Sequence, residues 1–417
     1  IDIDVLLYEY FDDILQLCGQ KDQYRTLVEK TIEGKIYITL HHFVPLKAAI
    51  ECDKSISYVQ KSKIFKDNNQ LINSLKIQKA HALLNSGMNL EGELTLKEVQ
   101  SQWLVSNEQF EAKAIFDMFD RLCAVYVKFN CYDVACDYSK LSLKMAEKVS
   151  DVSLSIIAYR TRAKLFYLNN LKKCQKSLDM VDELLKIAPS TRIQLNNNIY
   201  SAIVDLTYHE KEDYTDIINR LEQLRQQACD QNMNRAEIQS GMALAAAYLK
   251  RGYSKDIVTA KQIAKKAIDC SISYGIPSYL WQLYNLIGII DTKLKKSTNI
   301  IKQSFENVYE ILEKQDLLFI GRSDLCYSNL LAISNVAFFF QKYMFQKTFC
   351  ERISKITYCT SAYVEDDTLG TSNNRHLTED DLVQFFKKAR NKELIFSSSN
   401  LSTLLRDDET GYFIALT

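Results

Sequence analysis

Glycine and proline are scarce in this sequence, with 11 and 3 residues among 417. Average usage of about 7% glycine and 5% proline would give roughly 29 and 21 in a chain of this length. These two residues punctuate strands and turns, so a chain that is poor in both is mostly helical. A length of 417 residues allows two or three ordinary domains or one long repeat array, and this composition favours the array.

The sequence also lacks an excess of charge and a long apolar run. Lys plus Arg equals Asp plus Glu at 52 each, which leaves no electrostatic argument for nucleic acid or a charged membrane surface as partner. No stretch of 18 or more apolar residues occurs, so we expect no membrane-spanning helix. The first residues, starting at Ile1, are acidic and amphipathic, unlike a signal peptide. We expect a chain that starts at Ile to be a piece of a larger protein.

Cysteine is frequent, with 11 residues, but an odd number cannot all pair. The cysteines fall inside apolar helical patterns, which predicts reduced core residues in a cytoplasmic protein. Apolar residues make up 47% of the chain. This fraction is enough for a continuous core and argues against disorder.

The middle of the chain carries a helical pattern that repeats. Its apolar residues follow steps of three and four, which place one stripe on one face of a helix. Asn170 is the predicted N-cap of one such helix, and Pro189 ends it. Asp213 is the predicted N-cap of the corresponding helix in the next unit. The stripes are Leu171, Cys174, Leu178, Val181 and Leu185 in the first unit, and Ile217, Leu221, Leu224 and Ala228 in the second.

This pattern recurs with a period near 40 residues. Small or apolar anchors of the second helix in each pair are spaced by 39, 43, 43 and 41 residues. Two helices per unit at such a period indicate an α-solenoid, in which each unit needs its neighbours to bury its apolar face. We therefore predict an all-α fold, an α-solenoid of helix pairs with a small mixed C-terminal cap. The anchors are Ala135, Cys174, Ile217, Ala260 and Ile301.

Residues 110–345 resemble tetratricopeptide repeats. Tyr126, Asn130, Tyr132 and Ala135 stand at offsets 0, 4, 6 and 9, matching an aromatic, a turn residue, an aromatic and a small residue of that motif. The period exceeds the usual value of about 34, so these are lengthened, diverged repeats. The prediction for residues 110–345 is a stack of tetratricopeptide-like helix pairs.

The two ends of the chain differ from the middle. Residues 1–109 form a predicted N-terminal helical region, either diverged repeats or the tail of a preceding domain. Residues 346–417 form a predicted C-terminal cap with short strands and one helix. The expected strands are Ile353–Cys359, Glu393–Phe396 and Gly411–Thr417, and the expected helix begins at Thr378.

Motifs of catalysis and cofactor binding are missing. No GxxxxGK[ST] phosphate loop, GxGxxG or GxSxG occurs. His209-Glu210 is not followed by the second histidine of the HExxH zinc motif, and Cys131 and Cys136 lack the CxxC spacing. We therefore expect a chain that is not an enzyme, with no catalytic residue, no metal and no cofactor.

Two stretches, Ile276–Gly288 and Leu405–Leu416, resemble the C-terminal repeat region of bacterial signal-transduction ATPases of the STAND class, including antiviral members. The resemblance implies a helical-repeat sensor that follows an effector domain and a nucleotide-binding domain. It implies a folded protein as partner, in antiviral members a phage protein such as terminase or portal. It also implies that binding drives oligomerisation through the upstream domains.

Two other functions are compatible with the same repeats. One is an intracellular regulator whose repeats bind a short peptide. The other is a scaffold subunit of a multiprotein complex. All three hypotheses describe a protein-recognition module, with neither nucleic acid nor membrane as partner.

The recognition surface is predicted on the concave face of the superhelix. This face is lined mainly by the first helix of each pair, whose outward positions can be polar without disturbing the core. Groups strung along several repeats favour a folded partner with an interface near roughly 1,600 Å² over a small molecule. The predicted partner-binding residues are Tyr159, Asn198, His209, Gln239, Gln282 and Asn285.

Overall fold

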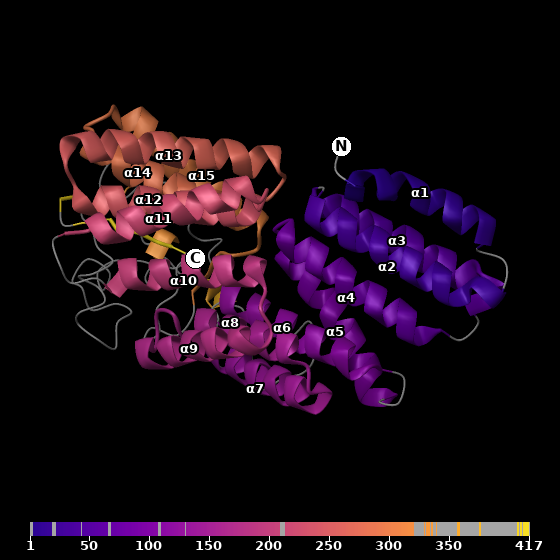
Figure 1. Cartoon of the computed structure of the whole chain (residues 1–417). Coiled ribbons are helices and arrows are strands. Elements are labelled where there is room, and N and C mark those ends of the chain that lie inside the picture. The colour runs from indigo at the N-terminus through magenta and orange to yellow at the C-terminus, as the bar shows by residue number, and fades with distance from the viewer. Residues whose placement is uncertain are drawn as a thin grey trace.

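A computed structural model describes residues 3–320 apart from 19–21, 43, 66–67, 107–109, 130 and 209–212. Beyond residue 320 the described residues are 329, 331–333, 335–336, 339, 357–358, 375–376, 407, 409–410 and 412–416. Helices dominate these residues, and they pack in consecutive pairs (Figure 1). The predicted all-α solenoid of tetratricopeptide-like helix pairs is confirmed.

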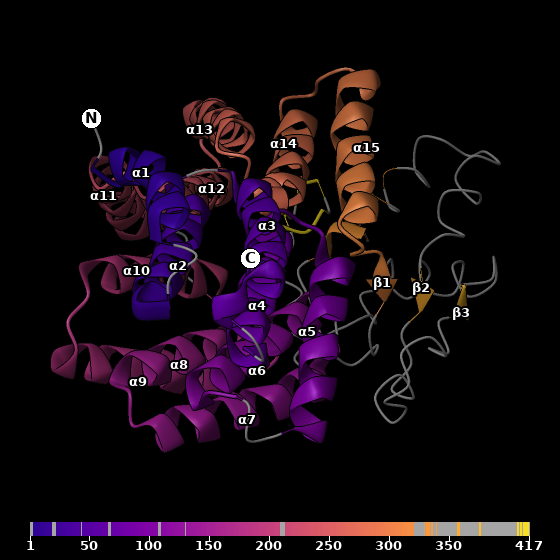
Figure 2. The same cartoon turned by 90° about the vertical axis from the view of Figure 1, so that its right-hand side faces the viewer.

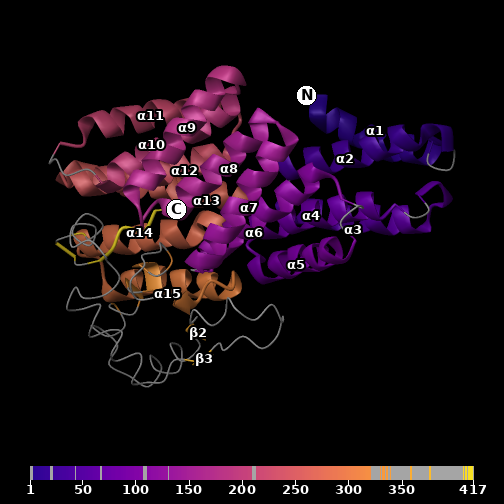
Figure 3. The same cartoon turned by 90° about the horizontal axis from the view of Figure 1, so that it is seen from below.

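The helices before residue 110 form one side of the molecule and the later repeats form the other (Figure 3). The early helices are α1 (Ile3–Cys18), α2 (Arg25–His42), α3 (Pro45–Lys61), α4 (Asn69–Asn85) and α5 (Asn89–Val105). Five pairs follow: α6 (Ala112–Lys128) with α7 (Tyr132–Val149), α8 (Val152–Phe166) with α9 (Leu171–Ile187), α10 (Thr191–Tyr208) with α11 (Thr215–Asp230), α12 (Asn234–Arg251) with α13 (Ser254–Ser273), and α14 (Leu280–Lys293) with α15 (Thr298–Lys314).

The predicted anchor residues all lie on second helices. Ala135, Cys174, Ile217, Ala260 and Ile301 belong to α7, α9, α11, α13 and α15, and each is at most 8% exposed. Their spacing therefore gives the true length of one helix pair. Because the apolar face of each helix is covered by its neighbours, most of the buried side chains from Ile77 to Leu416 form one continuous core.

The local signals act as the sequence predicts except at α11, where the N-cap is Tyr214 and not the predicted Asp213. The Asp213 side chain accepts a 2.9 Å hydrogen bond from the Thr215 amide. The Asn170 side chain accepts a hydrogen bond from the Lys173 amide, capping the start of α9. Between α14 and α15 the helices approach closely at Gly288, where a Cβ atom would lie 2.8 Å from Cζ of Phe305. Any larger residue there would force the two helices apart.

The first helices of the pairs line the inside of the superhelix. Contacts between successive first helices join α4 to α6, α6 to α8, α10 to α12 and α12 to α14. Between α8 and α10 the link is Tyr167, which hydrogen-bonds to the Thr207 hydroxyl and accepts a bond from the Tyr208 hydroxyl. The second helices lie on the outside (Figure 2), and we call the inner side of the superhelix, which the first helices line, the hollow.

The superhelix closes on itself around the hollow, because the turn between α4 and α5 meets the last repeats. The Asn89 side chain donates a 2.7 Å hydrogen bond to the Gln315 carbonyl, and Arg235 donates a 2.8 Å bond to Asn85. Gly87 has a φ of +81°, and a Cβ atom there would lie 2.9 Å from the Gln315 side chain. We call these interactions the closure contact. They join residues up to 226 positions apart in the sequence.

The described C-terminal residues pack on the last repeat. Tyr412 is 1% exposed, with its ring centroid 4.9 Å from that of Phe305. Lys293 forms a 2.6 Å ion pair with Asp407. A small sheet joins β1 (Phe319–Ile320) in parallel to β2 (Thr357–Tyr358), which pairs antiparallel with β3 (Arg375–His376).

The outcome for the expected C-terminal elements is mixed. The strand β2 falls inside the expected run Ile353–Cys359, whereas the described part of the final run shows only a single bridge residue at Phe413. The expected strand Glu393–Phe396 and the expected helix from Thr378 lie outside the described residues. The boundaries of the three predicted regions stay predictions.

Candidate functional site

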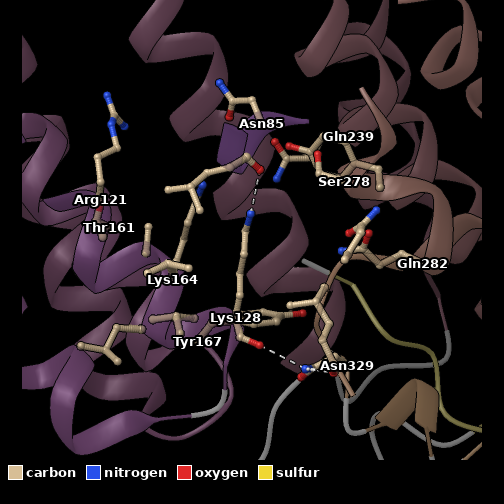
Figure 4. A pocket seen from close by; sticks show the side chains of 18 of the residues that line it. Asn85, Arg121, Lys128, Thr161, Lys164, Tyr167, Gln239, Ser278, Gln282 and Asn329 are labelled. Atoms are coloured by element: carbon tan, nitrogen blue, oxygen red, sulfur yellow. Dashed lines mark hydrogen bonds between the residues drawn. The ribbon is translucent and has the colours of Figure 1, made fainter. Parts of the chain in front are cut away.

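A pocket of about 290 Å³ opens into the hollow, on the inner side of the closure contact. Helices α4, α6, α8, α12 and α14 all contribute to its wall, together with residues 315, 317 and 329. Figure 4 shows Lys128 and Lys164 on one side of it and Gln239, Ser278 and Gln282 on the other. The pocket thus exists only because repeats that are distant in the sequence are brought together.

Lys128 lines the pocket and also binds Asn89, a residue of the closure contact. It is the last residue of α6, and its ammonium group donates hydrogen bonds to the Leu84 carbonyl at 3.3 Å and the Asn89 side chain at 3.0 Å. Its own carbonyl accepts a 3.1 Å bond from Asn329. Burial, together with the positive charge of Arg235, lowers the Lys128 pKa to about 8.

A lysine makes an equivalent hydrogen bond three repeats later. Lys250, in the last turn of α12, donates a 3.0 Å bond to the Leu206 carbonyl near the end of α10. Burial lowers its pKa to about 8 as well. In both places a lysine donates to a carbonyl at the end of the preceding inner helix, where carbonyls lack the usual helical partners. Lys128 and Lys250 therefore have a structural role in stacking the repeats.

Lys164 is different, because the structure gives it no such role. Within the part of the chain that the structure describes, its ammonium group has neither a hydrogen-bond partner nor an ion pair. The Lys164 side chain is exposed, but the surface that it exposes lies inside the pocket, among the other lining residues. Desolvation by this protein lowers its pKa to about 7, and the positive charges of Arg160 and Arg235 contribute. The surroundings of Lys164 therefore disfavour the charged form of its side chain.

An acidic group lies close to these cations. Asp120 is 2% exposed, and burial raises the pKa of its carboxyl group, although Arg121 and a hydrogen bond from Thr161 oppose this shift. The nearest Arg121 nitrogen is 3.9 Å from a carboxylate oxygen of Asp120, too long for a hydrogen bond. The Oδ1 atom of Asp120 and the Nε atom of Arg121 have no partner among the described residues.

The opposite wall is polar and aromatic. Gln239 is 9% exposed and Gln282 is 4% exposed, and both line the pocket. The Arg235 guanidinium lies 6.0 Å from the ring centroid of Tyr279, within the range of a cation–π interaction. The Ser278 hydroxyl is buried without a partner in the described part of the chain. This wall offers hydrogen-bonding groups to a molecule in the pocket.

Of the six predicted partner-binding residues, the structure brings Gln239 and Gln282 together in the pocket. Tyr159 packs instead against the apolar cluster of Ile156, Val181 and Leu185. Asn198 lies on α10, where its side chain accepts a 3.0 Å bond from Gln194. His209 lies outside the described residues.

Asn285 is the sixth predicted residue, and it is fully buried. Its side chain donates to the Phe413 carbonyl at 3.1 Å and accepts a 2.8 Å bond from Asn335. The Asn285 side chain therefore holds the C-terminal segment against α14.

Sequence reasoning missed Asp120, Lys128, Lys164 and Arg235 as pocket residues. A signal was present at two of them, because Asp120 and Lys164 interrupt apolar stretches of first helices. A charged residue in such a stretch is expected either to pair or to face an inner, wet surface. The period alone gave no reason to prefer these positions over other charged ones.

We find no metal site and no membrane-spanning helix among the described residues, and the thiols named below are buried. No group of three or more His, Cys, Asp and Glu residues there could hold a metal ion. Cys52, Cys123 and Cys174 are buried free thiols, as the apolar helical patterns around them predict. No described helix is long and apolar enough to cross a membrane.

Comparison with known proteins gives matches among solved structures. No family model matches the chain, and no curated protein matches it. Among solved structures, the chain is similar to a Signal Transduction ATPase with Numerous Domains (STAND) protein with a tetratricopeptide repeat sensor from Pyrococcus horikoshii, at 14% identity and a TM-score of 0.46. The match covers 84% of this chain and 49% of that protein, so the chain spans about half of its length.

Proposed function

We propose that this chain is a non-catalytic protein-recognition module, the target-sensing region of a larger bacterial signalling or antiviral ATPase. The observation that carries the proposal is the pocket in the hollow, whose wall comes from five different inner helices. Side chains from so many repeats converge on one point only when the superhelix is closed. Occupation of the pocket therefore acts on the relative positions of all these repeats at once.

The target is a protein, and it presents a segment to the hollow. At about 290 Å³ the pocket is just below the range of about 300–1,000 Å³ for ligand pockets, so it cannot take a folded domain. A folded protein can place a loop or a terminus in it and rest on the surrounding rim. The resemblance of the sequence to antiviral STAND-class sensors makes a phage protein, such as terminase or portal, the expected target.

Purified phage proteins test this function directly. Binding of the chain to a panel of terminase and portal proteins is measured by biolayer interferometry. The informative double variant is Gln239→Ala with Gln282→Ala in the pocket, and the matched control is Gln175→Ala with Gln223→Ala on the outer helices α9 and α11. We expect at least about a tenfold loss for the pocket variant and no loss for the control. Binding that both variants retain, or a panel that gives no binding, would contradict the proposal.

The small size of the pocket is the one observation that favours a second function, a regulator that binds a short peptide. The two functions differ in how much the surface around the pocket contributes to the binding affinity. A peptide cut from the contacting segment of a bound target should bind much more weakly than the whole protein if the chain is a sensor of folded proteins. Equal affinity of peptide and protein would favour the peptide regulator.

A further inference from the structure

The wall of the hollow carries more positive than negative charge. Arg121, Lys128, Lys164 and Arg235 line the pocket, and Asp120 is the acidic residue among them. Within the described residues none of Lys128, Lys164 and Arg235 forms an ion pair. Burial raises the pKa of the Asp120 carboxyl group, and even the ionised carboxylate is outnumbered by the four cations. A molecule in the pocket therefore meets a net positive field.

Several polar atoms of the wall have no partner within the described part of the chain. These atoms are Oδ1 of Asp120, Nε of Arg121 and Oγ of Ser278, and each is buried. With almost no accessible surface, these atoms do not touch a molecule in the pocket, and the exposed atoms of the same wall are the ones that can bind it. A carboxylate can accept from the terminal N–H groups of Arg121, whose side chain is 27% exposed.

We propose that the hollow binds an acidic segment of the target protein, an inference that rests on the proposed function. Glu or Asp side chains of this segment lie against Lys164 and Arg121. The side chains of Gln239 and Gln282 on the opposite wall bind the backbone amides of the segment. Apolar lining residues such as Trp281 contact a neighbouring apolar side chain of the segment.

Helix ends of both kinds lie around the pocket. Asn85, Lys128 and Lys164 come from the last turns of α4, α6 and α8, whereas Arg235 and Gln282 come from the first turns of α12 and α14. Helix C-termini carry partial negative charge, which favours the lysines there. These lysines are side-chain cations, and they suit singly charged carboxylates spread along a peptide. Phosphate sites use backbone amides at helix N-termini or in glycine-rich loops, so inorganic phosphate is the ligand to compare.

Lys164 makes this binding depend on pH. Its pKa of about 7 means that it is mostly charged at pH 6 and mostly neutral at pH 8.5 in the empty pocket. An acidic segment binds the charged form, so affinity falls as the pH rises between these values, while Glu and Asp carboxylates stay ionised. The charged groups that act on Lys164 are Arg160, Arg235, Asp120 and Lys128, and Arg121 and His81 line the same pocket.

A labelled hexapeptide that alternates Glu and Leu is the probe, and its binding to the purified chain is measured by fluorescence anisotropy. The same peptide with Gln in place of Glu, and inorganic phosphate as competitor, are the comparison ligands. We expect the acidic peptide to bind, roughly tenfold more weakly at pH 8.5 than at pH 6. The Gln peptide should not bind, and millimolar phosphate should not displace the acidic one. Equal binding of the two peptides, or displacement by phosphate, would overturn the inference.

Variants of Lys164 assign the effect to this residue. Lys164→Gln should weaken binding at pH 6 by about tenfold. Lys164→Arg should keep the affinity at pH 6 and reduce the pH dependence to the part that Lys128 supplies, since arginine stays charged. Lys172→Gln, at an exposed position of the outer helix α9, is the control and should change nothing. An unchanged affinity in Lys164→Gln, with melting temperatures showing folded protein, would refute the site.

The peptide and the phage proteins together separate this inference from the proposed function. If the acidic peptide fails to bind while phage-protein binding still needs Gln239 and Gln282, the acidic-segment inference is wrong and the proposed function stands. If the peptide binds in the pocket but no phage protein does, the proposed function is wrong and the site for acidic segments stands.

Discussion

Lysines of the outer helices and lysines of the hollow meet different surroundings. Lys140 on α7 and Lys186 on α9 pair with Asp137 at 2.8 Å and Glu183 at 2.6 Å, and all four side chains are about two-thirds exposed. Within the described residues Lys164 on the inner helix α8 has no such pair. The equal totals of 52 basic and 52 acidic residues conceal this difference, because these outer charges are balanced locally and that inner one is not. The proposed recognition surface therefore carries a charge that the totals for the whole sequence do not show.

Separating an inner helix from its outer partner should have the largest effect on stability. Gly288 of α14 packs directly on Phe305 of α15, so Gly288→Val should destabilise the protein by about 3 kcal/mol through overpacking. Urea unfolding followed by circular dichroism measures the loss. Gly252→Ala tests a different effect, the strain of a φ of +79°, at a site where a Cβ atom would make only ordinary van der Waals contacts, the nearest at 3.7 Å. A smaller cost for Gly288→Val than for Gly252→Ala would show that the two layers are not tightly packed there.

Opening the closure contact should have the next largest effect. Asn89→Ala removes the bond to the Gln315 carbonyl and the bond that Asn89 accepts from the Lys128 ammonium group. Leaving these buried groups with fewer partners should cost about 2 kcal/mol. Thermal unfolding compared with that of the outer-helix control Gln223→Ala measures this. Equal stability of the two variants would indicate that the superhelix does not depend on the closure contact.

Removing the inner charge should raise stability instead of lowering it. The Lys164 pKa in the folded protein lies below its ordinary value of 10.5, so the charged form is disfavoured below about pH 7 and the penalty disappears as the pH rises toward 10. Lys164→Met should therefore raise the melting temperature at pH 6 and raise it less at pH 10. Lys172→Met on α9 serves as the outer control, with little effect at either pH. A lower melting temperature for Lys164→Met at pH 6 would mean that Lys164 has a stabilising partner.

An outer ion pair should contribute the least. Lys186→Ala removes an exposed pair with Glu183, and such pairs contribute about 0.5 kcal/mol or less. The free energy of unfolding at low and at high salt checks this, because an exposed pair is screened. A loss above about 1 kcal/mol would show that the outer charges are not simply solvated.

The repeat architecture was predictable because its signals are local. A stripe such as Leu178 and Val181 buries one face of a helix regardless of what lies far away, so spacing alone places Ala135 and Ala260 on second helices. The cap at Asn170 and the close packing at Gly288 are equally local. Signals of this kind lie within one helix or one helix pair, and the sequence displays them directly.

The pocket was not predictable in the same way, since it depends on the closure of the superhelix. Nothing near Asn85 in the sequence indicates that it contacts Arg235, 150 residues later. Helical geometry adds a second limit, because one residue of register turns a side chain by about 100 degrees. Gln282 and Asn285 were both predicted on the concave face, yet one lines the pocket and the other is buried against Phe413.

Hydrogen–deuterium exchange of the chain, with and without a bound phage target, would locate the recognition surface on the inner or the outer helices. We expect slower exchange on binding in the ends of α6 and α8 around Lys128 and Lys164 and at the start of α12 around Arg235, with α9 and α11 unchanged. Protection confined to the outer helices α9 and α11, with unchanged exchange around the hollow, would contradict the assignment of recognition to the inner face.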